Sequence, residues 1–82
     1  MINLILIIYT KMNLNIICEK KNIKINKTQA LKLELELNVS EYAKKWIELG
    51  DHLYNFHVDK ECKNEIIVSQ EQFNFINNIL KN

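Results

Sequence analysis

The chain of 82 residues contains no arginine, no proline and a single glycine, Gly50. Without arginine, the protein lacks the planar group that binds phosphate, carboxylate or guanine through two parallel hydrogen bonds. A single glycine excludes the glycine-rich loops that hold nucleotide phosphates. The three scarce residues have mostly GC-rich codons, whereas the abundant Ile, Asn and Lys have AT-rich ones. The composition therefore indicates an AT-rich genome, such as that of a low-GC bacterium or one of its phages or plasmids.

Long apolar runs are also missing. Residues 2–9 form the longest one, which is far shorter than the roughly 20 residues that span a bilayer. They also lack the preceding basic residue and the cleavage site of a signal peptide. We therefore expect a cytoplasmic protein with no membrane partner, whose two cysteines, Cys18 and Cys62, are reduced and pack as small hydrophobic side chains. Met12 offers an alternative start, which would make residues 1–11 an upstream extension.

What is present fits one folded domain spanning residues 1–82. Hydrophobic residues make up 48% of the chain and charged residues 26%, as in ordinary globular proteins. The charge is unevenly distributed, because residues 1–33 contain six Lys and one Glu (net +5) and residues 34–82 contain five Lys and nine Asp or Glu (net −4). Such a bipolar chain favours head-to-tail self-association or a charged partner, unless both poles are only solvated.

Alternating hydrophobic residues predict several strands. Residues 2–9 and 12–19 would form an antiparallel hairpin, with its turn at 10–11, and a third strand would follow at 23–26. The β-branched run at 65–68 predicts a short strand near the C-terminus.

Residues 29–37 (QALKLELEL) allow two interpretations. As a strand, this segment would have a leucine face and a charged face: Leu31, Leu33, Leu35 and Leu37 against Lys32, Glu34 and Glu36. As a helix, it would carry the same leucines in two patches on opposite sides. All nine residues favour helix, and Asn26 with Gln29 has the spacing of a capping box. We predict a strand, because burying four leucines should outweigh the small differences in helix propensity.

Two helices are predicted, at 40–49 and 70–81. Asn38 or Ser40 would cap the first helix, and Gly50 would end it in the left-handed conformation. Ser69, with Gln72 in a capping box, would begin the second. Residues 52–58 fit either a strand or a continuation of the first helix.

These elements together predict an α+β domain, in which two helices cover one face of an antiparallel sheet of about four to six strands. The shared core would contain four large side chains: Tyr42, Trp46, Phe73 and Ile76.

The helical interpretation of 31–50 resembles the helix-turn-helix of repressor-type DNA-binding proteins. The matching residues are Leu33 in the first helix, the run LNVS at 37–40 in the turn, and Ile47 and Gly50 in the second helix. Glu34 and Lys44 depart from the family pattern at two packing positions. The resemblance implies a DNA-binding regulator.

A basic cluster supports the same alternative function: Lys20, Lys21, Lys24 and Lys27. These side chains could bind phosphates as point charges. No aromatic residue lies among them to stack on bases. A solvated edge strand, whose lysines prevent unwanted pairing, explains the cluster better.

No motif predicts catalysis, a cofactor or a metal. His52, His57 and Cys62 have no shared ligand direction at their spacing, and the chain has no Cys-x-x-Cys pair. No residue near either cysteine would activate a thiolate.

We therefore expect a non-enzymatic protein-binding module, such as a phage or mobile-element inhibitor that covers the surface of a host enzyme, a defence complex or another nucleic-acid-processing complex. The candidate contact residues are acidic: Glu34, Glu36, Glu41, Glu48, Asp51, Asp59, Glu61 and Glu65. A homo-oligomer joined through an open sheet edge is a third possibility.

Overall fold

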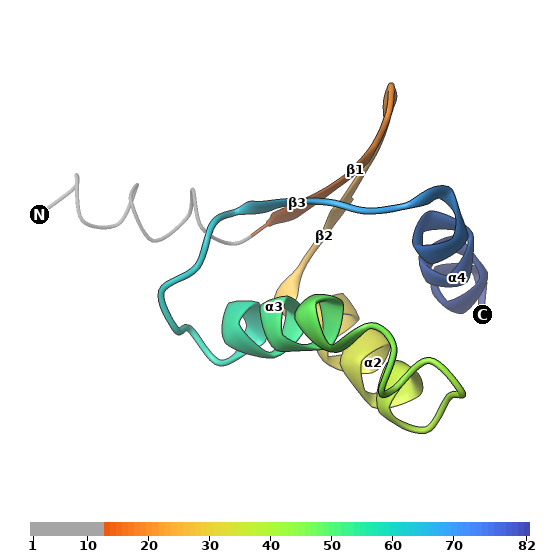
Figure 1. Ribbon diagram of the computed structural model, residues 1–82. Helices are drawn as coiled ribbons and strands as arrows, with labels where there is room; N and C mark the ends of the chain where they lie inside the picture. Colours follow the sequence, from red (N-terminus) through yellow and green to blue (C-terminus); the bar gives the residue numbers. More distant parts are fainter. Residues whose placement is uncertain (1–12) are drawn as a thin grey trace, which may run out of the picture.

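The computed structural model describes residues 13–82, which form an α+β domain (Figure 1). The elements follow in the order β1 Leu14–Cys18, β2 Lys21–Ile25, α2 Lys27–Asn38, α3 Ile47–His57, β3 Glu65–Ile67 and α4 Gln70–Lys81. The fold class agrees with the prediction, but the described residues contain three strands and three helices instead of four to six strands and two helices. The strand predicted at residues 2–9 lies outside the described residues.

The sheet has the strand order β2-β1-β3 and is mixed, not antiparallel. β1 pairs antiparallel with β2, from Leu14 opposite Ile25 to Cys18 opposite Lys21, and parallel with β3. The parallel pairing arises because two helices separate β2 from β3. α2 carries the chain away from the end of β2 and α3 brings it back, so β3 starts at the same end of the sheet as β1.

Residues 29–37 are helical, so the strand predicted for them is wrong. The capping box forms as its spacing indicates: the Gln29 N–H donates to Asn26 Oδ1, and the Asn26 N–H donates to Gln29 Oε1, both at 2.9 Å. Only Leu33 and Leu37 are buried, while Leu31 and Leu35 face solvent. The strand prediction assumed that all four leucines enter the core. Since only two do, helix propensity and the cap decide the conformation.

The helix predicted at 40–49 is misplaced. Residues 39–46 are a connection, and α3 begins at Ile47 and continues through 52–57. Gly50 lies inside this helix and does not end it. The Ser40 hydroxyl closes a turn directly after α2, where it donates to Leu37 O at 2.7 Å and accepts from the Tyr42 N–H at 3.1 Å.

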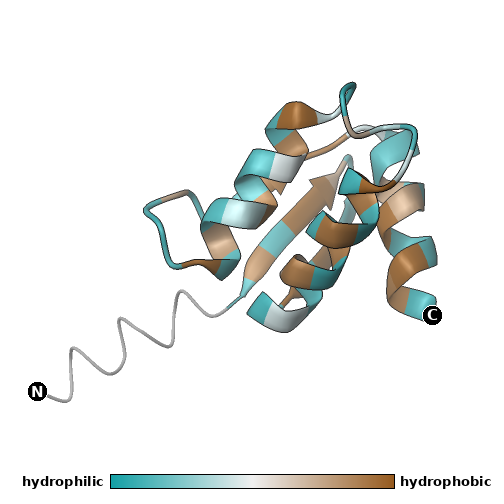
Figure 2. Cartoon of the chain, turned by 90° about the horizontal axis from the view of Figure 1, so that it is seen from below, coloured by the Kyte–Doolittle hydropathy of each residue, from teal (hydrophilic) through white to brown (hydrophobic). Residues whose placement is uncertain are grey.

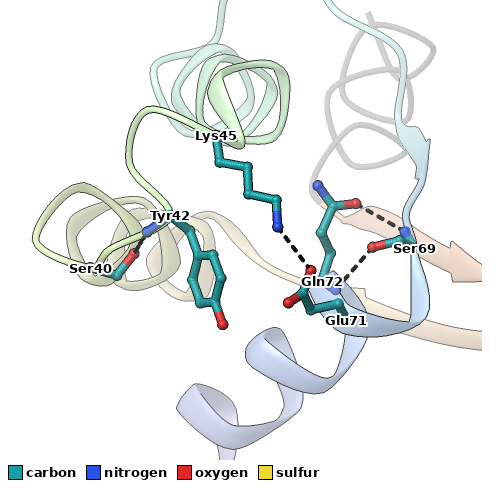
Figure 3. A network of polar contacts seen from close by, with 6 residues as sticks. All are labelled: Ser40, Tyr42, Lys45, Ser69, Glu71 and Gln72. Carbon is teal, nitrogen blue, oxygen red and sulfur yellow. Dashed lines mark hydrogen bonds and ion pairs between the residues drawn. The ribbon is translucent and has the colours of Figure 1, made fainter.

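The C-terminal helix matches its predicted bounds. Ser69 and Gln72 form the expected capping box, with distances of 3.1 and 2.9 Å. Figure 3 shows this cap beside the ion pair between Lys45 and Glu71, at 3.5 Å, which ties the 39–46 connection to α4.

The core lies between the sheet and the three described helices, which lie on one side of the sheet (Figure 1). Leu14, Ile16 and Ile25 face it from the strands and are fully buried. Most of the predicted shared core is confirmed, since Trp46, Phe73 and Ile76 are buried. Tyr42 is partly buried and stacks on Trp46, with ring centroids 3.9 Å apart. Cys18 is also buried in this core, while Cys62 packs at its border.

Candidate functional site

The outward side of the α2–α3 pair carries a group of large apolar side chains that the core does not use. We call this group the outer helix face: Leu31, Leu35, Ile47, Tyr54 and Val58. Each of these residues is between 37% and 58% exposed. Leu31 and Leu35 are one helical turn apart, as are Tyr54 and Val58. Figure 2 views the molecule from this side and shows hydrophobic segments on the helices that face the reader.

Three contacts along the seam hold α2 and α3 side by side in opposite directions. Lys27 at the start of α2 forms an ion pair with Asp59, just after the end of α3. In the middle, His57 Nε2 donates to Glu34 Oε1 at 2.6 Å, and both side chains are mostly buried. At the other end, Leu37 packs closely against Gly50.

A groove of about 380 Å³ opens between the two helices on the same side. Its lining residues are Glu34, Leu37, Asn38, Ala43, Trp46, Ile47, Gly50, Asp51 and Tyr54. Two carboxylates, those of Glu34 and Asp51, line the groove, and no lysine does. The apolar lining residues, such as Trp46 and Ile47, can contact an apolar group, and the two carboxylates favour a cation nearby.

Gly50 keeps this groove open because it has no side chain. A Cβ at this position would lie 3.4 Å from Leu37 Cδ2, which is an ordinary contact, and the residue has no positive φ. We expect Gly50→Ala to raise the free energy of unfolding by about 0.5–1 kcal/mol, since glycine is unfavourable within a helix. Urea denaturation would measure this change. A loss of stability would show that the α2–α3 seam is too tight for a methyl group.

The structure does not bring the eight predicted acidic residues into one surface. Glu36, Glu48 and Asp51 are exposed on α2 and α3, but Glu34 is bound to His57, and Asp59 is paired with Lys27. The other three lie elsewhere: Glu41 in the 39–46 connection, Glu61 before β3, and Glu65 at the first position of β3. Asp51 is the one exposed carboxylate among them that lines the groove.

The four lysines of the predicted basic cluster do not act as one group, because two of them have partners within the chain. Lys21 Nζ donates to Gln70 Oε1 at 3.0 Å and lies 5.7 Å from the centroid of the Phe73 ring. Lys27 is held by Asp59. Lys20 and Lys24 remain exposed, at the β1–β2 turn and on β2.

The helix-turn-helix geometry is not formed. In such motifs a turn of about three or four residues joins the two helices. Here residues 39–46 separate α2 from α3, and much of the expected second helix lies in that connection.

The two histidines have separate partners. His52 Nε2 donates to the Lys63 carbonyl at 2.9 Å, and His57 donates to Glu34. Between residues 13 and 82, no three His, Cys, Asp or Glu side chains lie close enough together to hold a metal ion. None of the helices in that range combines the length and apolar character needed to cross a membrane.

Sequence reasoning missed the outer helix face, although a signal for it was present. The helical interpretation of 29–37 puts the leucines in two opposite patches, and only one of these can face the core. Tyr54 and Val58 could not be placed while residues 52–58 were ambiguous. Ile47 could not be placed on the outer side of α3 because the helix predicted at 40–49 is misplaced.

Comparison of the chain with protein-family models, curated proteins and solved structures finds no match in any of the three. The function proposed below therefore rests on the outer helix face and its groove.

Proposed function

We propose that this protein is a non-enzymatic binding module that holds an amphipathic helical segment of another protein against its outer helix face. The observation that carries the proposal is the α2–α3 groove, which Ile47 and Tyr54 line, together with three further exposed apolar residues on or directly after the same helices: Leu31, Leu35 and Val58. Exposed apolar patches with a polar border are typical of protein interaction sites. Grooves between paired helices commonly accept an amphipathic helix through apolar side chains spaced one or two turns apart.

The charges around the groove favour a basic partner. Glu34 and Asp51 line it, and Glu36 and Glu48 add exposed carboxylates on the same two helices. An apolar side chain of the partner would enter above Gly50, between Ile47 and Tyr54. A flanking lysine or arginine would then lie near Asp51. This arrangement keeps part of the predicted acidic contact surface and adds the apolar contacts from which most binding energy comes.

Such binding could inhibit a host enzyme or defence complex by covering the surface it needs. Proteins that process nucleic acids often carry basic segments that contact phosphates, which is consistent with that role. The alternative, direct nucleic-acid binding, depends on Lys20 and Lys24, since Lys21 and Lys27 have partners within the chain.

A selection of helical peptides from a random display library, with the full chain as bait, tests the proposal. The selected peptides should combine Leu, Ile or Phe at helical spacing with Lys or Arg. The double substitution Leu35→Gln and Ile47→Gln should weaken their binding by about tenfold or more, since it removes two apolar contacts and leaves the core intact. The matched control is Ile67→Gln, which changes an exposed isoleucine on the opposite side of the sheet.

Two results would overturn the proposal. One is equal affinity of the selected peptides for the double variant and the wild type. The other is that labelled duplex DNA binds instead and is released when Lys20 and Lys24 are replaced by glutamine.

A further inference from the structure

The described sheet ends in two edge strands, β2 and β3, whose outer sides pair with no strand among residues 13–82. Exposed strand edges are sites at which another strand can add to a sheet. The two edges here also differ in charge, because β2 carries lysines and β3 carries Glu65. This difference indicates which kind of strand would add to each edge.

The outward backbone groups of β3 belong to Glu65 and Ile67. The Asn15 N–H donates to the Asn64 carbonyl at 2.9 Å, and the Val68 N–H donates to the Ile17 carbonyl at 2.8 Å. In a parallel pair, alternate residues point toward the neighbour. Residues 64, 66 and 68 therefore face β1, and the N–H and C=O groups of 65 and 67 point away from the sheet.

The outward groups of β2 follow from the same pattern. Residues 15 and 17 of β1 face β3, so 14, 16 and 18 face β2. Their partners in the register are Ile25, Ile23 and Lys21. The N–H and C=O groups of Asn22 and Lys24 therefore point outward.

These two edges are complementary, and we propose that a second copy of this chain joins them, its β2 adding antiparallel to β3 of the first. β2 runs antiparallel to β3 within one sheet, so copies in the same orientation present the correct strand directions. With Ile66 opposite the second copy's Ile23, Glu65 lies opposite its Lys24, and Ile67 lies opposite its Asn22. This register pairs all the outward backbone groups of residues 65 and 67 with those of residues 22 and 24.

The side chains support that register on both faces of the extended sheet. Ile23 and Ile66 are each only partly buried, and both pack on the core side of their strands. Opposite each other, they would bury one another's exposed surface. On the other face, Glu65 and Lys24, both exposed, would form a cross-strand ion pair.

Charge disfavours the symmetric alternatives. Pairing β2 with β2 would bring together two edges that each carry Lys20, Lys21 and Lys24. Pairing β3 with β3 would bring together two edges that carry Glu61 and Glu65. The favoured contact is therefore head to tail, and it leaves one edge of each kind open for further copies. Because β3 has three residues, we expect weak association that depends on concentration.

Sedimentation velocity of the full chain from roughly 10 μM to 1 mM tests this inference. The average mass should rise with concentration, and less steeply at high salt. Either K24E or E65K alone should keep the protein monomeric, since each places like charges opposite one another. An equimolar mixture of the two variants should associate again, because every contact between unlike copies then joins opposite charges. K32E and E36K, which make the same charge changes on α2, should associate like the wild type.

Four outcomes would overturn the inference. The wild type could remain monomeric to about 1 mM. K24E or E65K could associate as well as the wild type, or their mixture could fail to associate although circular dichroism shows both to be folded. Association could instead be lost in the Leu35→Gln and Ile47→Gln variant, which would place the contact on the outer helix face. Only the last result bears on peptide binding in the α2–α3 groove, which is measured separately, because it would place self-association on the surface proposed for the peptide.

Discussion

Replacing Leu33 by alanine should lower the free energy of unfolding by about 3 kcal/mol, whereas the same replacement at Leu35 should lower it by less than about 0.5 kcal/mol. The two residues are neighbours in the leucine pattern of α2, but Leu33 is 0% exposed and Leu35 is 56% exposed. Truncation of Leu33 removes buried methyl groups and leaves a cavity. Truncation of Leu35 removes carbon atoms that are already in water, and alanine favours helix.

Urea denaturation of the two variants measures this difference. Leu37, one turn after Leu33, and Leu31, one turn before Leu35, allow the same comparison to be repeated. Leu37→Ala should behave like Leu33→Ala, because Leu37 is also buried, and Leu31→Ala should behave like Leu35→Ala. A strand would give four similar losses, because all four leucines would share one face. Four similar values would therefore contradict the helical assignment of residues 27–38.

Replacing His57 by alanine should lower the free energy of unfolding by about 2 kcal/mol. His57 Nε2 donates to the carboxylate of Glu34, and the two side chains are only 13% and 16% exposed. Without the imidazole, Glu34 keeps a mostly buried carboxylate that has lost its donor. A buried acceptor without its donor costs more than an average hydrogen bond contributes.

His52→Ala is the control, since His52 donates to a backbone carbonyl at an exposed site and its loss should cost less than about 1 kcal/mol. His57→Gln retains a side-chain donor and should recover part of the stability. In a double-mutant cycle with Glu34→Ala, the double variant should lose less than the sum of the two single variants. Additive losses, or equal losses at His52 and His57, would show that the pair does not stabilise the α2–α3 seam.

The 39–46 connection explains why the second helix could not be located from the sequence. Its letters favour helix, and Glu41 and Lys45 even have a favourable spacing. The Ser40 turn, the stacking of Tyr42 on Trp46 and the ion pair of Lys45 with Glu71 all depend on residues brought together in the fold. Phe75 of α4 adds edge contacts to both aromatic rings, at centroid distances of 5.6 and 5.5 Å. These contacts hold residues 39–46 in a non-helical conformation, so α3 begins at Ile47.

Elements whose signals are local can be located from the sequence. Alternation located β1 and β2, the β-branched run located β3, and the cap at Ser69 located α4, because each of these signals involves residues within a few positions of one another. The capping box at Asn26 is equally local and forms as its spacing indicates, although the alternation of leucines next to it favours a strand.

Tertiary structure alone decided which leucines of α2 enter the core, since that depends on where the sheet and α3 lie. It also paired Glu34 with His57, 23 positions apart, and placed the lysines of β2 and the carboxylate of Glu65 on opposite edges of one sheet. Periodicity indicates which residues share a face, but it does not indicate what that face meets. Both candidate surfaces of this protein, the outer helix face and the two sheet edges, are defined by what the fold leaves uncovered.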